Sequence, residues 1–534
     1  MTAARLAAIL IGATALAIVL DIALLRFIQR RRGNGSSIGR KRIRLPSFTK
    51  VKESRLVVFL RELYSAGRDL YAEIKQDERK MLRAFVLAAT IIFSISLGYT
   101  HRQALMVEGW QLWAWLSCVL IATVAAMPNL RPPWSFKRQD LWVLIPVLFG
   151  LLLRTISLET IPAGLHPDEV TTTDFTIRHI FPPQGQTFYP LRSGPYSQPG
   201  LYYYLIYISL QIFGRTFTAL RVPGVIAGTL AILATYAMIA TRDDRRTALF
   251  AAILLSGFHF HLHWSRLALN NVWDTLWIPL VLAAFAWGWH SRWSGGAVIA
   301  GLALGISQYF YVGSRIALLL LPVLIIRLWH ERSDYRELLV HSGKLLAVAA
   351  AAAIPLFIFA LDNPDLFLSR ATINWTLPRM IGEQSQLSVG ETILALGHQA
   401  WISFAGFFSF SDYTAFYKPG VPFLLGLSGI FFLAGILLAI YQRRVLLLVW
   451  LGITIFFGAF LIPGPPGTSH IIPAVPAMIW LVTLPLSEMY RHGYKRLVPI
   501  LLLMMIATDI YFYYGIYIPG GADPDLSLPF PEIP

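Results

Sequence analysis

The sequence predicts an all-α polytopic membrane protein, and three observations lead to this fold class. Of its 534 residues, 56% are hydrophobic and only 14% are charged, unlike a soluble globular protein. Apolar stretches recur along the chain at lengths close to those that cross a bilayer. Arginine and lysine residues gather in short segments between these stretches, as the positive-inside rule expects of cytoplasmic loops.

The apolar stretches predict spanning helices whose boundaries are approximate, because several are shorter than the roughly 20 residues that a straight span needs. In chain order they are Leu6–Leu25, Ala84–Tyr99, Leu112–Met127, Leu141–Leu153, Val222–Ala240, Ala248–Leu262, Val272–Trp289, Ala297–Tyr311, Ile316–Trp329, Leu345–Leu361, Phe423–Ile440, Val445–Ile462, Ile471–Leu486 and Leu497–Tyr514.

Basic residues fix the predicted orientation. Only Arg5 precedes the first stretch, whereas a dense cluster from Arg26 to Arg44 follows it, so the amino terminus is expected outside and Arg26 onward in the cytoplasm. No small-residue cleavage site follows this stretch, which favours an uncleaved anchor. Alternation then places every later basic cluster inside: Arg131/Lys137/Arg138, Arg242/Arg245/Arg246, Arg327/Arg332/Arg336, Arg443/Arg444 and Arg491/Lys495/Arg496.

The same alternation predicts two long extracytoplasmic segments, residues 157–221 and 362–422, which exceed ordinary loop lengths. The first contains an apolar, aromatic stretch from Gln198 to Gly214. Counting that stretch as a span would invert every later loop, so we expect a helix in the outer interface, where tyrosines favour the boundary. Functional residues are expected in these two segments.

The segment after the first stretch contains a Gly/Ser/Arg linker, Arg32–Ser37, and then apolar residues at helical spacing, which are Leu56, Leu60, Leu63, Leu70 and Ile74. This predicts an amphipathic helix on the inner leaflet, with a disordered tether as an equal alternative. The cytoplasmic loops contain no glycine-rich phosphate loop, which argues against ATP-driven transport.

Charge distribution and cysteine content argue against a nucleic-acid partner and against a protein held by disulfides or a cysteine-ligated metal. The net charge of +16 could suggest a nucleic-acid partner, but the positions of the basic residues are explained by membrane topology, so no nucleic acid is expected. The single cysteine, Cys118, lies in an apolar stretch. It excludes an intramolecular disulfide and argues against a cysteine-ligated metal.

An acidic pair lies in the first outer segment, within His166-Pro167-Asp168-Glu169. Proline followed by acids is typical of helix N-termini, because the acids complement exposed N–H groups. A carboxylate at a membrane surface could equally serve as a base beside a lipid-borne substrate. The two interpretations are compatible.

A second polar cluster surrounds residues 258–271. If the helix continues, His259, His263, Arg266 and Asn270 form one polar stripe near the outer boundary. The histidine pair at i, i+4 could bind zinc, but no acidic partner completes that site locally, and interfacial histidines beside a snorkelling arginine are the plainer interpretation. Arg315 starts a span from the same side, so the guanidinium groups of Arg266 and Arg315 could bind a phosphate there.

Several segments together resemble a known family, in their order and spacing more than in any single motif. They are Leu151-Leu152-Leu153-Arg154, Asp168-Glu169, Gln198-Pro199-Gly200-Leu201-Tyr202-Tyr203, Phe213-Gly214, Leu220-Arg221-Val222-Pro223, Ser265-Arg266, Tyr309–Arg315 and Ser469–Ala477. Over residues 140–515 the chain resembles the GT-C polytopic glycosyltransferases, in particular the protein O-mannosyltransferase and aminoarabinose transferase superfamily. Gly200 departs from the family's second proline, and His470 stands where an arginine or aromatic residue is more frequent.

The resemblance implies a glycosyltransferase with an extracytoplasmic site in the plasma membrane. A sugar on a polyprenyl phosphate would pass, with inversion, to an acceptor hydroxyl on a protein, lipid or glycan, in contact with membrane lipids. Its implied residues are Asp168 as base with Glu169 beside it; Arg266, Arg315, His470 and Lys418 for the donor phosphate; and His166, Tyr202, Tyr203, His263 and Asn270 in the substrate loops. Whether a divalent metal assists is left open.

The expected domains are an N-terminal extension with about three transmembrane helices and a basic linker (1–138), a GT-C transmembrane domain (139–516) and a short extracytoplasmic tail (517–534). Two other functions compete. An outer-leaflet polysaccharide ligase or polymerase also uses polyprenyl-linked sugars, but would depend on arginine and histidine without the acidic pair. A transporter or lipid flippase is expected to show internal repeats, which we do not find.

The charge distribution generates a topological prediction. Cysteines introduced at Gln184 and Gln386 should react with an impermeant maleimide added to intact cells, because both outer segments are expected on the extracytoplasmic face. Labelling that requires the membrane to be opened to the cytoplasmic side would contradict the topology.

Overall fold

The computed structural model describes residues 55–101, 106–128, 133, 138–180, 186–188, 198–377, 388–409, 416–520 and 528–530. The expected first span, Leu6–Leu25, and its basic linker lie outside these ranges, as do Gln184, Gln386 and most of the expected tail.

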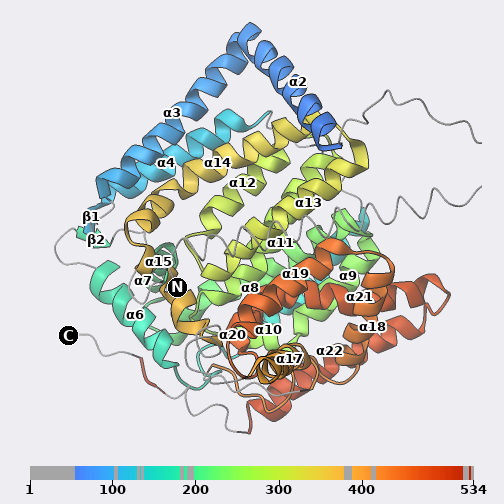
Figure 1. Ribbon diagram of the computed structural model, residues 1–534. Helices are drawn as coiled ribbons and strands as arrows, with labels where there is room; N and C mark the ends of the chain where they lie inside the picture. Colours follow the sequence, from blue (N-terminus) through green and yellow to red (C-terminus); the bar gives the residue numbers. More distant parts are fainter. Residues whose placement is uncertain are drawn as a thin grey trace, which may run out of the picture.

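The described chain is almost entirely helical, which confirms the predicted all-α class (Figure 1). Two three-residue strands are the exception: β1 (Met106–Glu108) pairs antiparallel with β2 (Gln186–Phe188). The α-helices are α2 (Arg55–Gln76), α3 (Glu78–His101), α4 (Gly109–Ala126), α5 (Leu144–Thr155), α6 (Pro167–Ile180), α7 (Leu201–Phe213), α8 (Phe217–Arg242), α9 (Arg245–Gly257), α10 (His259–Trp264), α11 (Asp274–His290), α12 (Gly295–Ser307), α13 (Ile316–Arg332), α14 (Tyr335–Asp362), α15 (Pro364–Asn374), α17 (Val389–Ala405), α18 (Leu427–Tyr441), α19 (Val445–Ile455), α20 (Thr468–Ile471), α21 (Val475–Arg491) and α22 (Leu497–Ile510).

Within the described ranges, seven helical segments are long and apolar enough to cross a membrane. They are Glu78–Thr100, Phe217–Arg242, Asn271–His290, Val312–Arg332, Tyr335–Asp362, Ser469–Arg491 and Leu497–Tyr517. The other expected spans of these ranges are present as shorter helices. The aromatic stretch expected in the outer interface forms α7, and the amphipathic pattern near residue 60 forms α2.

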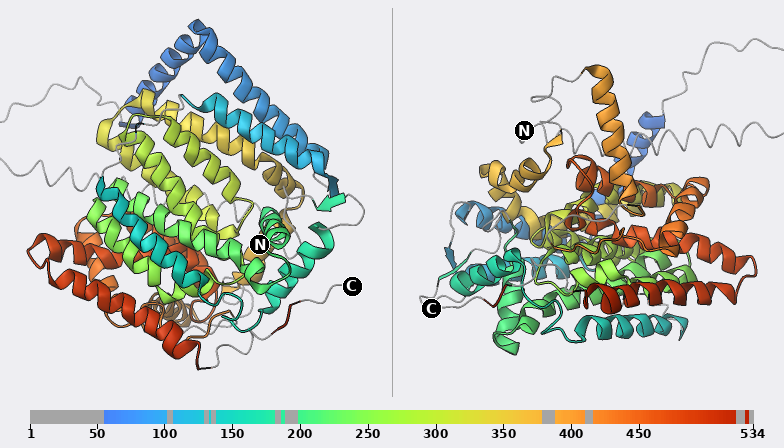
Figure 2. Two further views of the ribbon diagram at one scale, coloured as in Figure 1. Left: turned by 180° about the vertical axis from the view of Figure 1, so that it is seen from behind. Right: turned by 90° about the horizontal axis from the view of Figure 1, so that it is seen from below.

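Helices α8, α11 and α21 make up the centre of the bundle. In Ser469–Arg491, which contains α21, 89% of the most apolar stretch is buried, against 22% in Glu78–Thr100 of α3, which lies at the edge. Figure 1 shows α3 meeting α2 in a wedge above the yellow helices, and Figure 2 shows α17 projecting away from the bundle. Side chains of α3 and α4 join α14, because Ser94 Oγ donates to the Ala351 carbonyl and Trp115 Nε1 to that of Ala352 (both 2.9 Å).

Ion pairs join the basic loops to one another at one end of the bundle. Arg245 Nε lies 2.5 Å from Asp140 Oδ1, and Arg491 donates to Asp244. The Asp243 carboxylate accepts from Arg444 and, at 2.6 Å, from Trp480 Nε1. Basic clusters far apart in the sequence therefore meet at a common end of the described bundle, as the alternating span order requires.

One expected helix is broken, so the predicted polar stripe is wrong. Residue Phe258 has non-helical angles (φ −58°, ψ 113°) between α9 and α10, and α10 ends at Trp264. Arg266 and Asn270 therefore lie beyond the helix that carries His259 and His263. The break lets His259 reach the Tyr417 hydroxyl at 2.7 Å, a contact that a continuous helix pattern could not anticipate.

Close packing of α12 against α14 depends on glycine. A Cβ built on Gly301 would lie 2.4 Å from the Leu345 carbonyl oxygen, and one on Gly305 would lie 2.6 Å from Ala352 Cβ. Glycines four residues apart let two backbones approach, as in many membrane helix pairs.

Gly301→Ala should therefore destabilise the protein by about 1–3 kcal/mol, because the backbone of α14 cannot move aside like a flexible side chain. The midpoint of thermal unfolding in detergent measures the effect. Gly452→Ala is the matched control, since a Cβ there meets no atom within 4 Å. Equal midpoints for the two variants would contradict the packing argument.

Candidate active site

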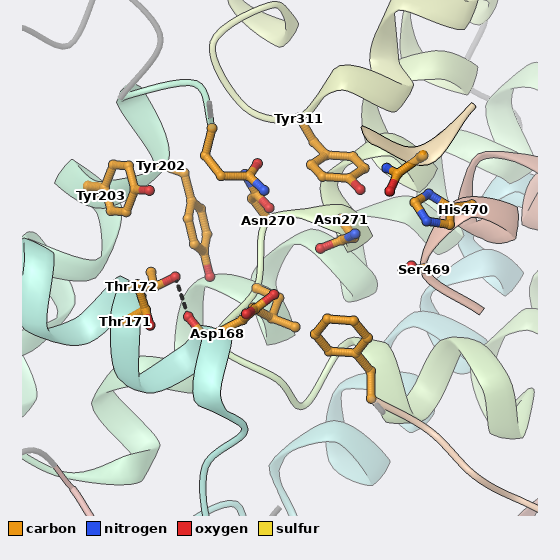
Figure 3. Close-up of a pocket in the computed structure, with 14 residues that line it drawn as sticks. Asp168, Thr171, Thr172, Tyr202, Tyr203, Asn270, Asn271, Tyr311, Ser469 and His470 are labelled. Atoms are coloured by element: carbon orange, nitrogen blue, oxygen red, sulfur yellow. Dashed lines mark hydrogen bonds between the residues drawn. The ribbon is translucent and has the colours of Figure 1, made fainter. Parts of the chain in front are cut away.

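A cavity of about 330 Å³ lies where the two expected outer segments meet (Figure 3). Segments that are distant in the sequence supply its walls, and most of the lining groups are neutral polar or aromatic. The lining residues are Asp168, Thr171, Thr172, Gln198, Tyr202, Tyr203, Leu269, Asn270, Asn271, Tyr311, Asn374, Phe416, Ser469 and His470. A concave site with a few convergent polar groups is the usual form of a small-molecule site.

Asp168 sits in the first turn of α6, with its side chain exposed to the cavity. Its backbone N–H donates to His166 Nδ1 at 3.1 Å, so the His166 ring caps the helix. The Thr172 hydroxyl donates to the Asp168 backbone carbonyl at 2.7 Å (Figure 3). Within the part of the chain that the structure describes, no hydrogen bond or ion pair engages the Asp168 carboxylate, which leaves it available to a ligand.

Glu169 has a different environment from its neighbour. It is fully buried, and its two carboxylate oxygens accept from the backbone N–H groups of His166 (2.9 Å) and Ala268 (2.6 Å). Burial raises the pKa of the Glu169 carboxyl, while Arg221 and the two N–H groups oppose the rise. The side chain therefore ties the start of α6 to the segment that leads to Asn270.

Asn270 is held in the cavity wall by two bonds. Its Nδ2 donates to the Gln198 side chain at 3.1 Å and to the Phe310 carbonyl at 2.6 Å. Nearby, the buried Tyr202 hydroxyl has no hydrogen-bond partner among the described residues, and Figure 3 shows it directed toward Asp168. Each group presents a fixed polar atom at the cavity.

The arginines expected to bind phosphate lie outside the cavity lining. Arg266 is fully buried and donates to the carbonyls of Leu153 (2.8 Å), Ile156 (2.6 Å) and Ile161 (3.0 Å). Because these contacts occupy both terminal nitrogens, the guanidinium holds the end of α5 and the chain that follows it in place. The Arg315 guanidinium carbon lies 3.9 Å from the centre of the Phe367 ring.

Three other expected residues are also outside the lining. His263 is fully buried, with Nε2 2.8 Å from the Phe416 carbonyl. The His166 ring packs against Phe416, with ring centres 4.2 Å apart. Lys418 is exposed. His166 and His263 thus contact Phe416 of the cavity wall, and Lys418 lies two residues after Phe416 in the chain.

The structure thus brings together Asp168, Tyr202, Tyr203, Asn270 and His470 from the expected set. Thr171 and Thr172 were overlooked, although they lie one helical turn from Asp168 on the same face. Asn374 and Phe416 come from the second outer segment and carry no local signal of a site.

No group of three or more potential metal-binding side chains occurs among the described residues. The histidine pair considered for zinc is engaged elsewhere, since His259 Nε2 faces the Phe423 carbonyl at 3.1 Å and His263 Nε2 faces that of Phe416.

Glu169→Gln should lower the midpoint of thermal unfolding, because the amide –NH₂ cannot accept and would confront one of the two buried N–H groups. An unsatisfied buried donor costs about 1–3 kcal/mol. Asp168→Asn, at the next position, should change the midpoint less. A Glu169→Gln variant with unchanged stability would contradict a supporting role for this side chain.

Comparison with known proteins finds sequence similarity over part of the chain. Residues 197–359 match the family model described as dolichyl-phosphate-mannose-protein mannosyltransferase. A curated relative, the undecaprenyl phosphate-alpha-4-amino-4-deoxy-L-arabinose arabinosyl transferase 1 of Pseudomonas fluorescens, is 27% identical over 166 residues. That match spans 30% of this chain and 30% of the relative.

Two solved structures are similar to the chain at low identity. ArnT from Cupriavidus metallidurans bound to undecaprenyl phosphate is 16% identical, with 69% of this chain and 63% of that chain covered and a TM-score of 0.45. Archaeal oligosaccharyltransferase AglB from Archaeoglobus fulgidus, in complex with an inhibitory peptide and a dolichol-phosphate, is 18% identical, with 73% and 56% covered and a TM-score of 0.45. The family model and the curated relative each match about a third of this chain or less, so these comparisons report similarity over that part alone.

Proposed function

We propose that the protein is a membrane glycosyltransferase that moves a sugar from a polyprenyl-phosphate donor to an acceptor hydroxyl in the cavity of Figure 3, with Asp168 as the base. The observation that carries the proposal is the contrast between two adjacent carboxylates. Asp168 faces the cavity without a protein partner among the described residues, whereas Glu169 is buried and holds two backbone N–H groups.

The chemistry needs a group of this kind. A hydroxyl is a poor nucleophile until a base takes its proton, so the Asp168 carboxylate would accept that proton as the oxygen attacks the anomeric carbon. The new carbon–oxygen bond forms as the bond to the phosphate oxygen breaks, and the lipid phosphate leaves as an anion. Direct displacement of this kind inverts the anomeric configuration.

The cavity's other groups suit a sugar and its leaving group. Asn270, Asn271 and the Tyr202 hydroxyl can hydrogen-bond sugar hydroxyls, and the rings of Tyr311 and Phe416 offer apolar faces. His470 lies across the cavity from Asp168 in Figure 3, where an imidazole could donate to the departing phosphate. Separation of the base from the phosphate-binding group is what an in-line displacement requires.

Two further features support the proposed class of donor and the proposed membrane face of the cavity. The curated relative is named as a transferase that uses an undecaprenyl-phosphate sugar. The chain matches only 30% of that relative, so the donor class is part of our proposal. The basic loops meet at one end of the bundle, and the positive-inside rule would put the opposite end, with the cavity, on the extracytoplasmic face.

Asp168→Asn tests the function directly. The variant should fold and insert, because asparagine also suits a helix start, yet lose transfer by about 10²–10⁴-fold, since the amide cannot take the acceptor's proton. Sugar transfer by purified protein in lipid, with polyprenyl-phosphate sugars and membrane acceptors, gives the rate.

The chain contains a matched control. Asp365 also follows a proline in the first turn of a helix, α15, and lies outside the cavity lining. Asp365→Asn should retain transfer. Near-normal transfer by Asp168→Asn would show that Asp168 only begins a helix and would overturn the proposed mechanism.

A further inference from the structure

Helix α2 runs along one boundary of the bundle. It ends at Gln76, and α3, which is long and apolar enough to cross a membrane, begins two residues later at Glu78. Toward its other end, the Phe59 ring packs against Trp329 and Tyr335, with ring centres 5.1 and 5.7 Å apart. Those two residues lie at the end of α13 and the start of α14, so α2 connects the ends of three candidate spans (Figure 1).

Polar contacts fix α2 in this position. Glu73 accepts from Arg336 of α14 at 2.7 Å and from Lys80 of α3 at 2.6 Å. These two cations, Arg336 first, lower the pKa of the Glu73 carboxyl to about 2. Gly67 faces Leu339 of α14. One side of α2 is therefore attached to the bundle.

The adjoining side of α2 carries an exposed apolar row. Val57, Tyr64 and Tyr71 recur every seven residues, which places them along one line of a helix. Their side chains are 49, 75 and 68% exposed, and Leu60 beside them is 52% exposed. Exposed apolar side chains aligned along one helix are typical of an interaction surface.

A basic row runs next to the apolar row. Arg61, Arg68 and Lys75 also recur every seven residues, each four positions after a member of the apolar row, and all three are exposed. The acidic residues Glu62 and Asp69 lie about a quarter turn further from the apolar row. Around the axis of α2, the cations therefore lie between the apolar row and the acidic residues.

We propose that these two rows bind the surface of an anionic lipid leaflet. The apolar row would enter the boundary between headgroups and acyl chains, while the three cations lie at the level of the lipid phosphates. A second copy of the chain is a poorer occupant, because pairing by this face would bring two like-charged rows together. The arginine distribution of the sequence assigns this end of the bundle to the cytoplasm, where leaflets are anionic.

The experiment uses the full chain, one copy per nanodisc, in the Cys118→Ser background. An environment-sensitive fluorophore is attached to a cysteine at Tyr64 or, as the matched control, at Glu62. In phosphatidylcholine nanodiscs that contain phosphatidylglycerol, the label at position 64 should be blue-shifted and several-fold less quenched by iodide than the label at position 62. Removing phosphatidylglycerol, or introducing Arg61→Gln, Arg68→Gln and Lys75→Gln together, should reduce this protection.

Equal quenching at positions 64 and 62 in anionic nanodiscs would overturn the proposal. Protection at position 64 that is unaffected by lipid charge and by the triple variant would overturn its electrostatic part. Protection that appears only when two copies share a nanodisc would identify a second copy as the occupant. Thermal unfolding of each labelled protein shows that α2 still belongs to a folded bundle.

Discussion

Satisfaction of backbone carbonyls by buried arginines is the interaction on which the candidate site depends. The chain between α5 and α6 is irregular, so its carbonyls lack the partners that a helix would supply. Arg266 donates to the carbonyls of Ile156 and Ile161, and Arg221 to those of Leu158 and Gly164. Both guanidinium groups are fully buried. The rigid donor fork of arginine lets each side chain serve several carbonyls.

The placement of Asp168 follows from this scaffold. Once the segment before α6 is fixed, Glu169 joins its start to the backbone at Ala268, and the His166 ring caps the helix. The carboxylate of Asp168 then faces the cavity, whereas that of Glu169 is engaged by two backbone N–H groups. Two adjacent acids thus differ in environment, because the Glu169 side chain meets backbone donors and the Asp168 side chain meets open space.

The N-terminal helices are connected to the cavity wall through Tyr309. Tyr309 donates through its hydroxyl to the Ala352 carbonyl, packs edge-on against Trp115 of α4, and accepts through its own carbonyl from the N–H of Leu201 at the start of α7. Tyr202, next along α7, lines the cavity. A chain of packed residues therefore links α4 to the cavity wall, and β1 pairs with β2 between α6 and α7. This continuity shows that α4 packs as part of the described bundle.

The sequence by itself determined the membrane class and the order of the apolar helices, because composition, hydrophobic length and charge asymmetry are local properties, and it singled out the acidic pair as a candidate. It also indicated α2 through its apolar periodicity. Only the tertiary structure decided which polar residues meet. Arg266 and His263 had the right chemistry for a ligand, but the break at Phe258 turned them toward carbonyls of α5 and of Phe416. Asn374 and Phe416 reached the cavity from a segment about two hundred residues beyond Asp168. Such contacts depend on where a long segment returns to the bundle, and no periodicity within that segment encodes its partner.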